Sequence, residues 1–227
     1  MKKILSLIIL CLAIPITSFA QLSIGTTAGY THNTLDTDTG YYYSREYISE
    51  GGFAVAVPIQ YSFNDWFSIG TEVGYTSKNY SWERIVTYFS NDDKEYERYK
   101  NGYLQIPITA KFSFGGERVR GFLNVGGYLG AWLNSSVTGF LVDPSSHTFV
   151  STQQSYDFLA ERDNRFDYGA LAGVGIEYRA TPQISLTIEG RLLYGLSDTQ
   201  KQYQMDQFHK YNTTMVAQMG LLYHFSL

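Results

Sequence analysis

Residues 102–114 read GYLQIPITAKFSF, and their side chains alternate between apolar and polar. The apolar positions are Leu104, Ile106, Ile108, Ala110, Phe112 and Phe114, and the residues between them are mostly polar. A period of two predicts a β-strand with one apolar and one polar face. A tilted strand of about 9–11 residues or slightly more crosses a bilayer. Gly115, Gly116 and Glu117 follow at once and predict a tight turn.

The same alternating unit recurs along the rest of the chain. The further strands are expected at 22–34, 52–63, 66–82, 118–133, 165–179, 184–196 and 211–225. Long polar connections at 35–50, 83–101, 134–164 and 197–210 alternate with short turns. This pattern predicts an all-β fold, an eight-stranded antiparallel transmembrane β-barrel with short periplasmic turns and long extracellular loops. An even strand number places both termini on the periplasmic side, and helical spanning is not expected because long apolar runs are missing.

The first 20 residues differ from the remainder. Lys2 and Lys3 precede an apolar run at 4–16, and Ser18 and Ala20 supply small residues near its end. This order predicts a secretory signal peptide at 1–20 and an outer-membrane barrel domain at 21–227. The single cysteine, Cys11, lies in the predicted signal, so disulfide and thiolate chemistry are not expected in the mature chain. Without Lys2 and Lys3, the 17 basic residues fall to 15 against 21 acidic ones, which disfavours nucleic-acid binding.

The polar faces of the predicted strands carry charges that would point into the barrel. In a small barrel the apolar face meets lipid and the polar face looks inward. Isolated interior charges are costly, so three acids and three bases in a narrow lumen are expected to pair. The predicted lumen charge network is Glu72, Lys111, Arg120, Glu177, Glu189 and Arg191. Pro58 and Pro107 each remove a ladder donor inside a strand, which predicts a bulge or a water-satisfied gap at each.

Aromatic residues concentrate toward the ends of the predicted strands, which predicts two girdles at the membrane interfaces. The turn-side set is Phe63, Trp66, Phe67, Phe112, Phe114, Tyr178, Tyr223 and Phe225. The loop-side set is Tyr30, Tyr75, Trp82, Tyr103, Trp132, Phe166, Tyr168, Tyr194 and Tyr211. The alternative is that aromatic residues are simply good strand formers.

Three segments carry a family resemblance: YLQIPITAKF at 103–112, FDYGALAGVGIEY at 166–178 and IEGRLLYGLSD at 188–198. They resemble the small outer-membrane β-barrel proteins of Bacteroidota, often called PorT-like or porin-family proteins. The resemblance covers essentially the whole mature chain and implies insertion into the Gram-negative outer membrane by the outer-membrane assembly machinery. The C-terminal YHFSL is similar to the assembly signal of such proteins, although it ends in Leu227 and not in the commoner Phe. Most members of the family have no defined activity.

Catalytic and metal-binding sets are weak in this sequence. Histidines near aspartates in the predicted outer loops suggest an Asp–His pair at the barrel rim, but polar loops produce such neighbours by chance. The pairs are His32 with Asp36, His147 with Asp143 and His209 with Asp206, while His224 is expected to be an interior or turn-side residue. The acids Asp36 and Asp38, or those at 91–93, lack a full calcium ligand set. We therefore expect no enzyme activity, no cofactor and no metal.

Three functional classes follow from the expected architecture. The first is a structural, accessory or envelope-assembly role, with outer-membrane lipid, the assembly machinery and an envelope protein as partners. The second is adhesion or ligand recognition through tyrosine-rich extracellular loops, because exposed aromatic residues suit binding surfaces. The third is a small porin or an outer-membrane enzyme. A general diffusion pore is disfavoured, because eight strands enclose an interior that side chains fill.

Overall fold

The structure is a computed structural model that describes residues 21–37, 46–85, 94–143, 145–146, 148–201 and 209–225. The predicted signal peptide at 1–20 lies outside the described residues. Among the described residues, no helix is long and apolar enough to cross a membrane. The strands there are β1 (Gln21–Thr37), β2 (Glu46–Ser62), β3 (Phe67–Ser77), β4 (Tyr80–Ile85), β5 (Lys94–Gly115), β6 (Val119–Val142), β7 (Phe149–Ser155), β8 (Phe166–Arg179), β9 (Ile184–Gly195) and β10 (Lys210–Phe225).

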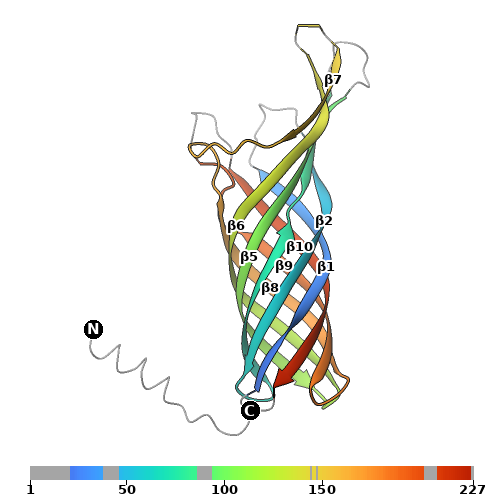
Figure 1. Cartoon of the computed structure of the whole chain (residues 1–227), viewed down its shortest axis with the longest axis vertical. Coiled ribbons are helices and arrows are strands. Elements are labelled where there is room, and N and C mark those ends of the chain that lie inside the picture. The colour runs from blue at the N-terminus through green and yellow to red at the C-terminus, as the bar shows by residue number, and fades with distance from the viewer. Residues whose placement is uncertain are drawn as a thin grey trace, which may run out of the picture.

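Eight of these strands close into a ring (Figure 1). The order around the ring is β1, β2, β3, β5, β6, β8, β9 and β10, and every pairing is antiparallel. The ring closes between β1 and β10, from the pair Leu22–Phe225 to the pair Thr37–Lys210. Closure satisfies the backbone hydrogen bonds that lipid cannot satisfy. The predicted eight-stranded antiparallel barrel is confirmed.

The remaining two strands belong to an extension beyond the loop end of the ring. β4 continues the path of β3 and, like it, lies between β2 and β5. β7 pairs with the last part of β6, beyond the segment of β6 that pairs with β8. The predicted loops 83–101 and 134–164 therefore contain regular strand, a difference from the sequence expectation. The charged segment KEYERYK at 94–100 can form a strand here because this part of the sheet projects beyond the closed ring (Figure 1).

Most outward positions of the ring are apolar and form an apolar wall, and aromatic residues are exposed near both ends of this wall. Phe63, Trp66, Phe114 and Tyr178 are examples at the turn end. Those at the loop end include Tyr30, Phe53, Phe166, Tyr168 and Tyr194. The prediction was wrong for Trp82, Tyr103 and Trp132, whose side chains are buried. Tyr103 and Trp132 share the strand phase of the inward residues Gln105 and Tyr128, so their side chains point inward.

Pro58 and Pro107 interrupt the ladder without shifting its register. Between β1 and β2, pairing stops after Ile24–Ile59 and resumes in the same register at Thr27–Ala56. Pro107 lies in a similar interruption between β3 and β5, and Thr71 Oγ1 donates a 2.8 Å hydrogen bond to the carbonyl of Pro107. Of the two predicted alternatives, the bulge is absent at both positions and a gap in the ladder is present. The β5–β6 register shift lies instead at Gly102/Tyr103.

Candidate functional site

The lumen near the turn end holds a buried charged layer contributed by β5, β8 and β10. Lys111 Nζ lies 2.6 Å from Glu177 Oε2 and 4.4 Å from the centre of the Phe122 ring. His224 hydrogen-bonds through Nδ1 to Ser23 Oγ at 2.6 Å and through Nε2 to Ser185 Oγ at 2.7 Å. Both serines are fully buried, so this serine–histidine group has no surface that a substrate can reach. It is a structural hydrogen-bond network.

The middle of the lumen is occupied by one arginine between two carboxylates. Arg191 binds Glu72 through both terminal nitrogens, at 2.7 and 3.0 Å, in the bidentate geometry of strong ion pairs. It also contacts Glu189 at 2.8 and 3.1 Å. Glu189 accepts two further hydrogen bonds, from Asn124 Nδ2 and Gln218 Nε2, both at 2.9 Å. Side chains from β3, β6, β9 and β10 therefore meet across the barrel at this level.

Five of the six charged residues predicted for the lumen lie in these two groups, Lys111 with Glu177 and Arg191 with Glu72 and Glu189, and Arg120 lies apart from both. The Arg120 guanidinium donates to the Gly116 and Asp65 carbonyls, each at 3.1 Å, and lies 3.5 Å from Asp65 Oδ1. Arg120 therefore does not join the lumen charge network predicted from the sequence. Arg120 is the second residue of β6, and its long side chain reaches the acceptors of the adjacent turns rather than the interior acids.

An ion pair that the sequence interpretation missed lies nearer the loop end. Lys78 Nζ is 2.7 Å from Asp167 Oδ2 and 3.3 Å from the Tyr128 hydroxyl, and Lys78 is fully buried. The lysine also lies over the Tyr103 and Tyr128 rings, 5.2 and 4.6 Å from their centres. The sequence did contain evidence for this pair. Lys78 is an even number of residues from the inward residue Glu72, and Asp167 is an even number from Glu177, so both share the inward strand phase.

Apolar packing and small cavities complete the interior. Tyr128, Leu171, Leu193, Val216 and Ala54 form a buried apolar cluster inside the ring. Two lumenal cavities of about 40 and 20 Å³ both border Glu72 and Arg191. Their linings include Asn124 and Gln105, whose buried Oδ1 and Nε2 atoms have no hydrogen-bond partner among the described residues. Such cavities have room for single ordered waters. Side chains pack the described lumen.

The mouth at the loop end of the barrel is covered by an aromatic cluster, defined as Tyr103, Trp132, Tyr156 and Phe158. The Trp132 ring stacks between Tyr103 and Tyr156, each with its centre 5.7 Å away, and Phe158 meets it edge-on at 4.9 Å. Tyr156 and Phe158 belong to the segment after β7, which folds back over the mouth. This cluster adds an aromatic layer above the polar lumen.

Asp163 holds that segment in place. Its carboxylate accepts hydrogen bonds from the Tyr156 hydroxyl at 3.0 Å, the Leu159 amide at 2.9 Å and the Arg162 guanidinium at 2.9 Å. Burial alone would raise the pKa of Asp163, but the hydrogen bonds from Arg162, Leu159 and Tyr156 outweigh burial and lower it. The ionised form of Asp163 therefore stabilises the segment over the mouth.

The predicted Asp–His pairs are not assembled in the described residues. His32 lies on β1 with its side chain on the outer wall and not in a loop. His209 is exposed and hydrogen-bonds through Nδ1 to Asp198 Oδ2 at 2.8 Å, while His147 and Asp206 lie outside the described residues. Asp36 accepts a hydrogen bond from Thr213, and no group of three His, Cys, Asp or Glu residues suited to a metal ion is found in the part that the structure describes. Residues Asp38 and 91–93 lie outside that part.

A comparison with family models decides the class of the protein. The model for the outer membrane protein beta-barrel domain matches residues 19–201. The chain belongs to this family. It is therefore an integral β-barrel protein of the outer membrane, with membrane lipid around its apolar wall. A search of curated proteins gave no match.

Solved structures resemble the chain in fold. The outer membrane protein OprG from Pseudomonas aeruginosa is 9% identical over 92% of this chain and 98% of that chain, with a TM-score of 0.51. Neisserial surface protein A is 15% identical over 89% of this chain and 97% of its own, with a TM-score of 0.45. The attachment invasion locus protein Ail of Yersinia pestis is 13% identical over 90% and 99% of the two chains, with a TM-score of 0.43. At these identities the likeness concerns the fold and not the activity.

Proposed function

We propose that this protein is a non-conducting outer-membrane scaffold whose extracellular extension recognises another macromolecule. The packed lumen argues against a diffusion pathway, because the Glu72–Arg191–Glu189 layer, the apolar cluster and the aromatic cluster lie in series along the barrel. The same packing argues against catalysis, because the interior serine–histidine group is inaccessible. The recognition role, the second class that the sequence favoured, fits the part of the molecule that projects furthest from the membrane.

The observation that carries this proposal is the edge of β7. Within the described residues β7 has a single neighbouring strand, β6 (Figure 1). Six of the seven residues of β7 are exposed. Proteins usually protect such an edge with charges, proline, a bulge or a covering segment. The sequence of β7, FVSTQQS, has no charged residue, proline or glycine. An extended partner segment can add to an unprotected edge by backbone hydrogen bonding.

An exposed apolar strip lies on the same extension. Tyr96 on β5 and Phe140 on β6 are cross-strand neighbours with ring centres 5.6 Å apart. Phe140 is 42% exposed and Tyr96 is 39% exposed, although neither belongs to the apolar wall of the ring. Aromatic residues exposed on a rigid sheet are typical of binding surfaces. The strip gives a partner side-chain contacts beside the backbone edge.

Finer features of the protein belong to the same proposal. We propose that residues 1–20 are a signal peptide, that both termini are periplasmic, and that the outer-membrane assembly machinery inserts the barrel. We further propose that the protein is one of the PorT-like outer-membrane proteins of Bacteroidota, and that it is not an enzyme. The support is the alternation of loop lengths, the N-terminal sequence pattern and the resemblance in the three segments described above.

The recognition role is tested by site-specific crosslinking in intact cells. A photo-crosslinking residue at Gln153 on β7 should give a discrete crosslinked product. The double variant Ser151→Lys/Thr152→Lys should abolish that product, because charges protect an edge against strand addition. The matched control, Thr138→Lys on β6, adds charge to the strand paired with Gln153 but leaves the edge unchanged. The absence of a discrete product in the parent protein would instead support a structural or envelope-assembly role.

A further inference from the structure

The outer wall of the barrel has a hollow in its lipid-facing side. The hollow has a volume of about 500 Å³ and crosses β1, β6, β8, β9 and β10. Its floor is formed by three small residues, Ala172, Gly190 and Ala217, of which Gly190 and Ala217 are direct register partners. A Cβ atom added to Gly190 would meet no other atom within 4 Å, which shows open space at that point. The surrounding outward side chains are large and apolar: Leu123, Val174, Leu192 and Met215.

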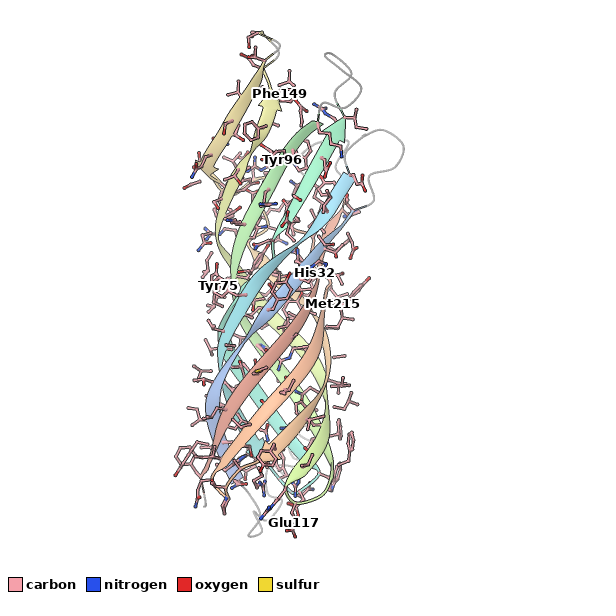
Figure 2. All side chains as sticks on the ribbon, turned by 90° about the vertical axis from the view of Figure 1, so that its right-hand side faces the viewer. His32, Tyr75, Tyr96, Glu117, Phe149 and Met215 are labelled. Carbon is pink, nitrogen blue, oxygen red and sulfur yellow. The ribbon has the colours of Figure 1, made fainter. Side chains whose placement is uncertain are left out.

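His32 lies at the border of this hollow. It is the register partner of Met215, and Figure 2 shows the two residues side by side on the outer wall at about the level of Tyr75. His32 is the next outward residue of β1 after Tyr30, so it lies at the level of the loop-end aromatic zone. The outward positions of the described ring strands between the two aromatic zones are apolar residues, glycine, threonine or tyrosine. Within the described residues His32 has no hydrogen-bond or ion-pair partner. An ionisable side chain on a membrane wall is expensive and is by default a functional residue whose partner has to be identified.

A single type of molecule satisfies both features. A hollow in a lipid-facing apolar wall accepts a hydrocarbon chain, because hydrocarbon surrounds that wall. The imidazole of His32 has an N–H donor in either tautomer and offers it to an anionic oxygen. The hydroxyl-bearing Tyr30, which also lines the hollow, provides a second donor at the same end.

We propose that the hollow and His32 form a binding site for a phosphorylated acyl lipid of the outer leaflet. One acyl chain lies over Ala172, Gly190 and Ala217, and the phosphate accepts a hydrogen bond from His32. The outer leaflet is the source because His32 lies toward the loop end of the wall, which faces outward in the proposed orientation. This inference uses that orientation but is independent of the recognition role of β7.

Native mass spectrometry of the detergent-solubilised full chain tests the site. The probes are monophosphoryl lipid A, the same lipid after removal of its phosphate, and phosphatidylglycerol as a phosphorylated lipid of the other leaflet. The parent protein should retain monophosphoryl lipid A in preference to both other probes. Equal retention of the dephosphorylated lipid would overturn the role of the phosphate, and preferred retention of phosphatidylglycerol would overturn the assignment to the outer leaflet.

Variants separate the hollow from the histidine. Gly190→Leu fills the open space and should abolish the preferential adduct, whereas the control Ala110→Leu adds similar bulk to the outward face of β5 and should leave the adduct unchanged. His32→Leu should reduce the preference for the phosphorylated lipid roughly tenfold, as expected for losing one hydrogen bond to a charged group. His32→Gln should restore part of the preference.

Three results would contradict the proposal. The first is an unchanged adduct in Gly190→Leu, and the second is equal loss in Ala110→Leu, which would indicate a general effect on lipid contact. The third is a protein dimer that Gly190→Leu disrupts, which would assign the hollow to a second copy of the chain. Heat-modified electrophoretic mobility of each variant shows whether its barrel is folded. Surface labelling of loop tags separately tests the orientation.

Discussion

Replacing Arg191 by leucine should destabilise the barrel mainly through Glu72. Every hydrogen bond that the structure gives to the Glu72 carboxylate comes from Arg191, whereas Glu189 would keep its bonds from Asn124 and Gln218. Removing one partner of a buried ion pair costs about 3–5 kcal/mol. The adjoining 40 Å³ cavity lets water reach Glu72, which places the expected loss toward the lower end, at about 3 kcal/mol.

Comparison with a double variant identifies the cause of that loss. In Glu72→Leu/Arg191→Leu the orphaned carboxylate is gone, so this protein should be more stable than Arg191→Leu alone. The coupling free energy between the two positions should be about 2 kcal/mol, within the range measured for residues in one network. Arg120→Leu is the matched control, because its Asp65 partner is exposed and such surface pairs contribute roughly 0–1 kcal/mol.

Urea titration of the folded barrel in lipid vesicles measures these free energies, provided that unfolding and refolding curves coincide. The reasoning fails if Arg191→Leu is as stable as the parent protein. It also fails if the double variant is less stable than the single one, because Glu72 would then not be the group left unsatisfied.

Three further predictions concern conduction, topology and pH. Purified protein in planar bilayers should show no large, stable conductance, and its liposomes should not swell in small sugars; an open channel passing such sugars would reject the packed lumen. Tags inserted near Asp92 and near Gly116 should be labelled and protected, respectively, in intact cells, and the reverse pattern would invert the proposed orientation. Because the folded-state pKa of Asp163 is lowered, its contribution to stability is complete above the ordinary aspartate pKa near 4 and is lost as the pH falls through the folded value. Exchange of the Leu159 amide, corrected for its intrinsic rate, should therefore accelerate in acid, and Asp163→Asn should remove that dependence.

The sequence predicted the ring and most of the inward charges because both follow from a period of two. Strand phase alone identifies the face of Glu72, Lys111, Glu177, Glu189 and Arg191. Phase does not give the level along the barrel, which is why Arg120 was grouped with residues that it does not meet. The lysine–aspartate pair was missed although strand phase could have found it, because Lys78 lies in the predicted strand at 66–82 and Asp167 in the one at 165–179.

The extension beyond the membrane was not predictable in the same way. β7 has one apolar residue on each face, Phe149 and Val150, and the rest of its FVSTQQS sequence is polar, so it does not show the apolar alternation of the ring strands. Its pairing with β6 depends on a reversal of the chain outside the membrane, where binary hydrophobic patterning is weak. Tyr103 and Trp132 show a related difficulty, because an aromatic residue at a strand end suits both a membrane interface and a packed mouth.

The lumenal ion pairs and hydrogen bonds also constrain how the barrel folds. Glu72 and Arg191 are separated by 119 positions in the chain, Lys111 and Glu177 by 66, and Ser23 and His224 by 201. None of these contacts can form within a single hairpin. A partly inserted sheet would hold its carboxylates and cations without partners in a medium of low dielectric constant, so intermediates between the open sheet and the closed ring are high in free energy. Closure of the ring should consequently be cooperative and slow. A catalyst that shields the open sheet from lipid should accelerate the assembly of this barrel more than that of a barrel whose lumen is lined with serine and glycine.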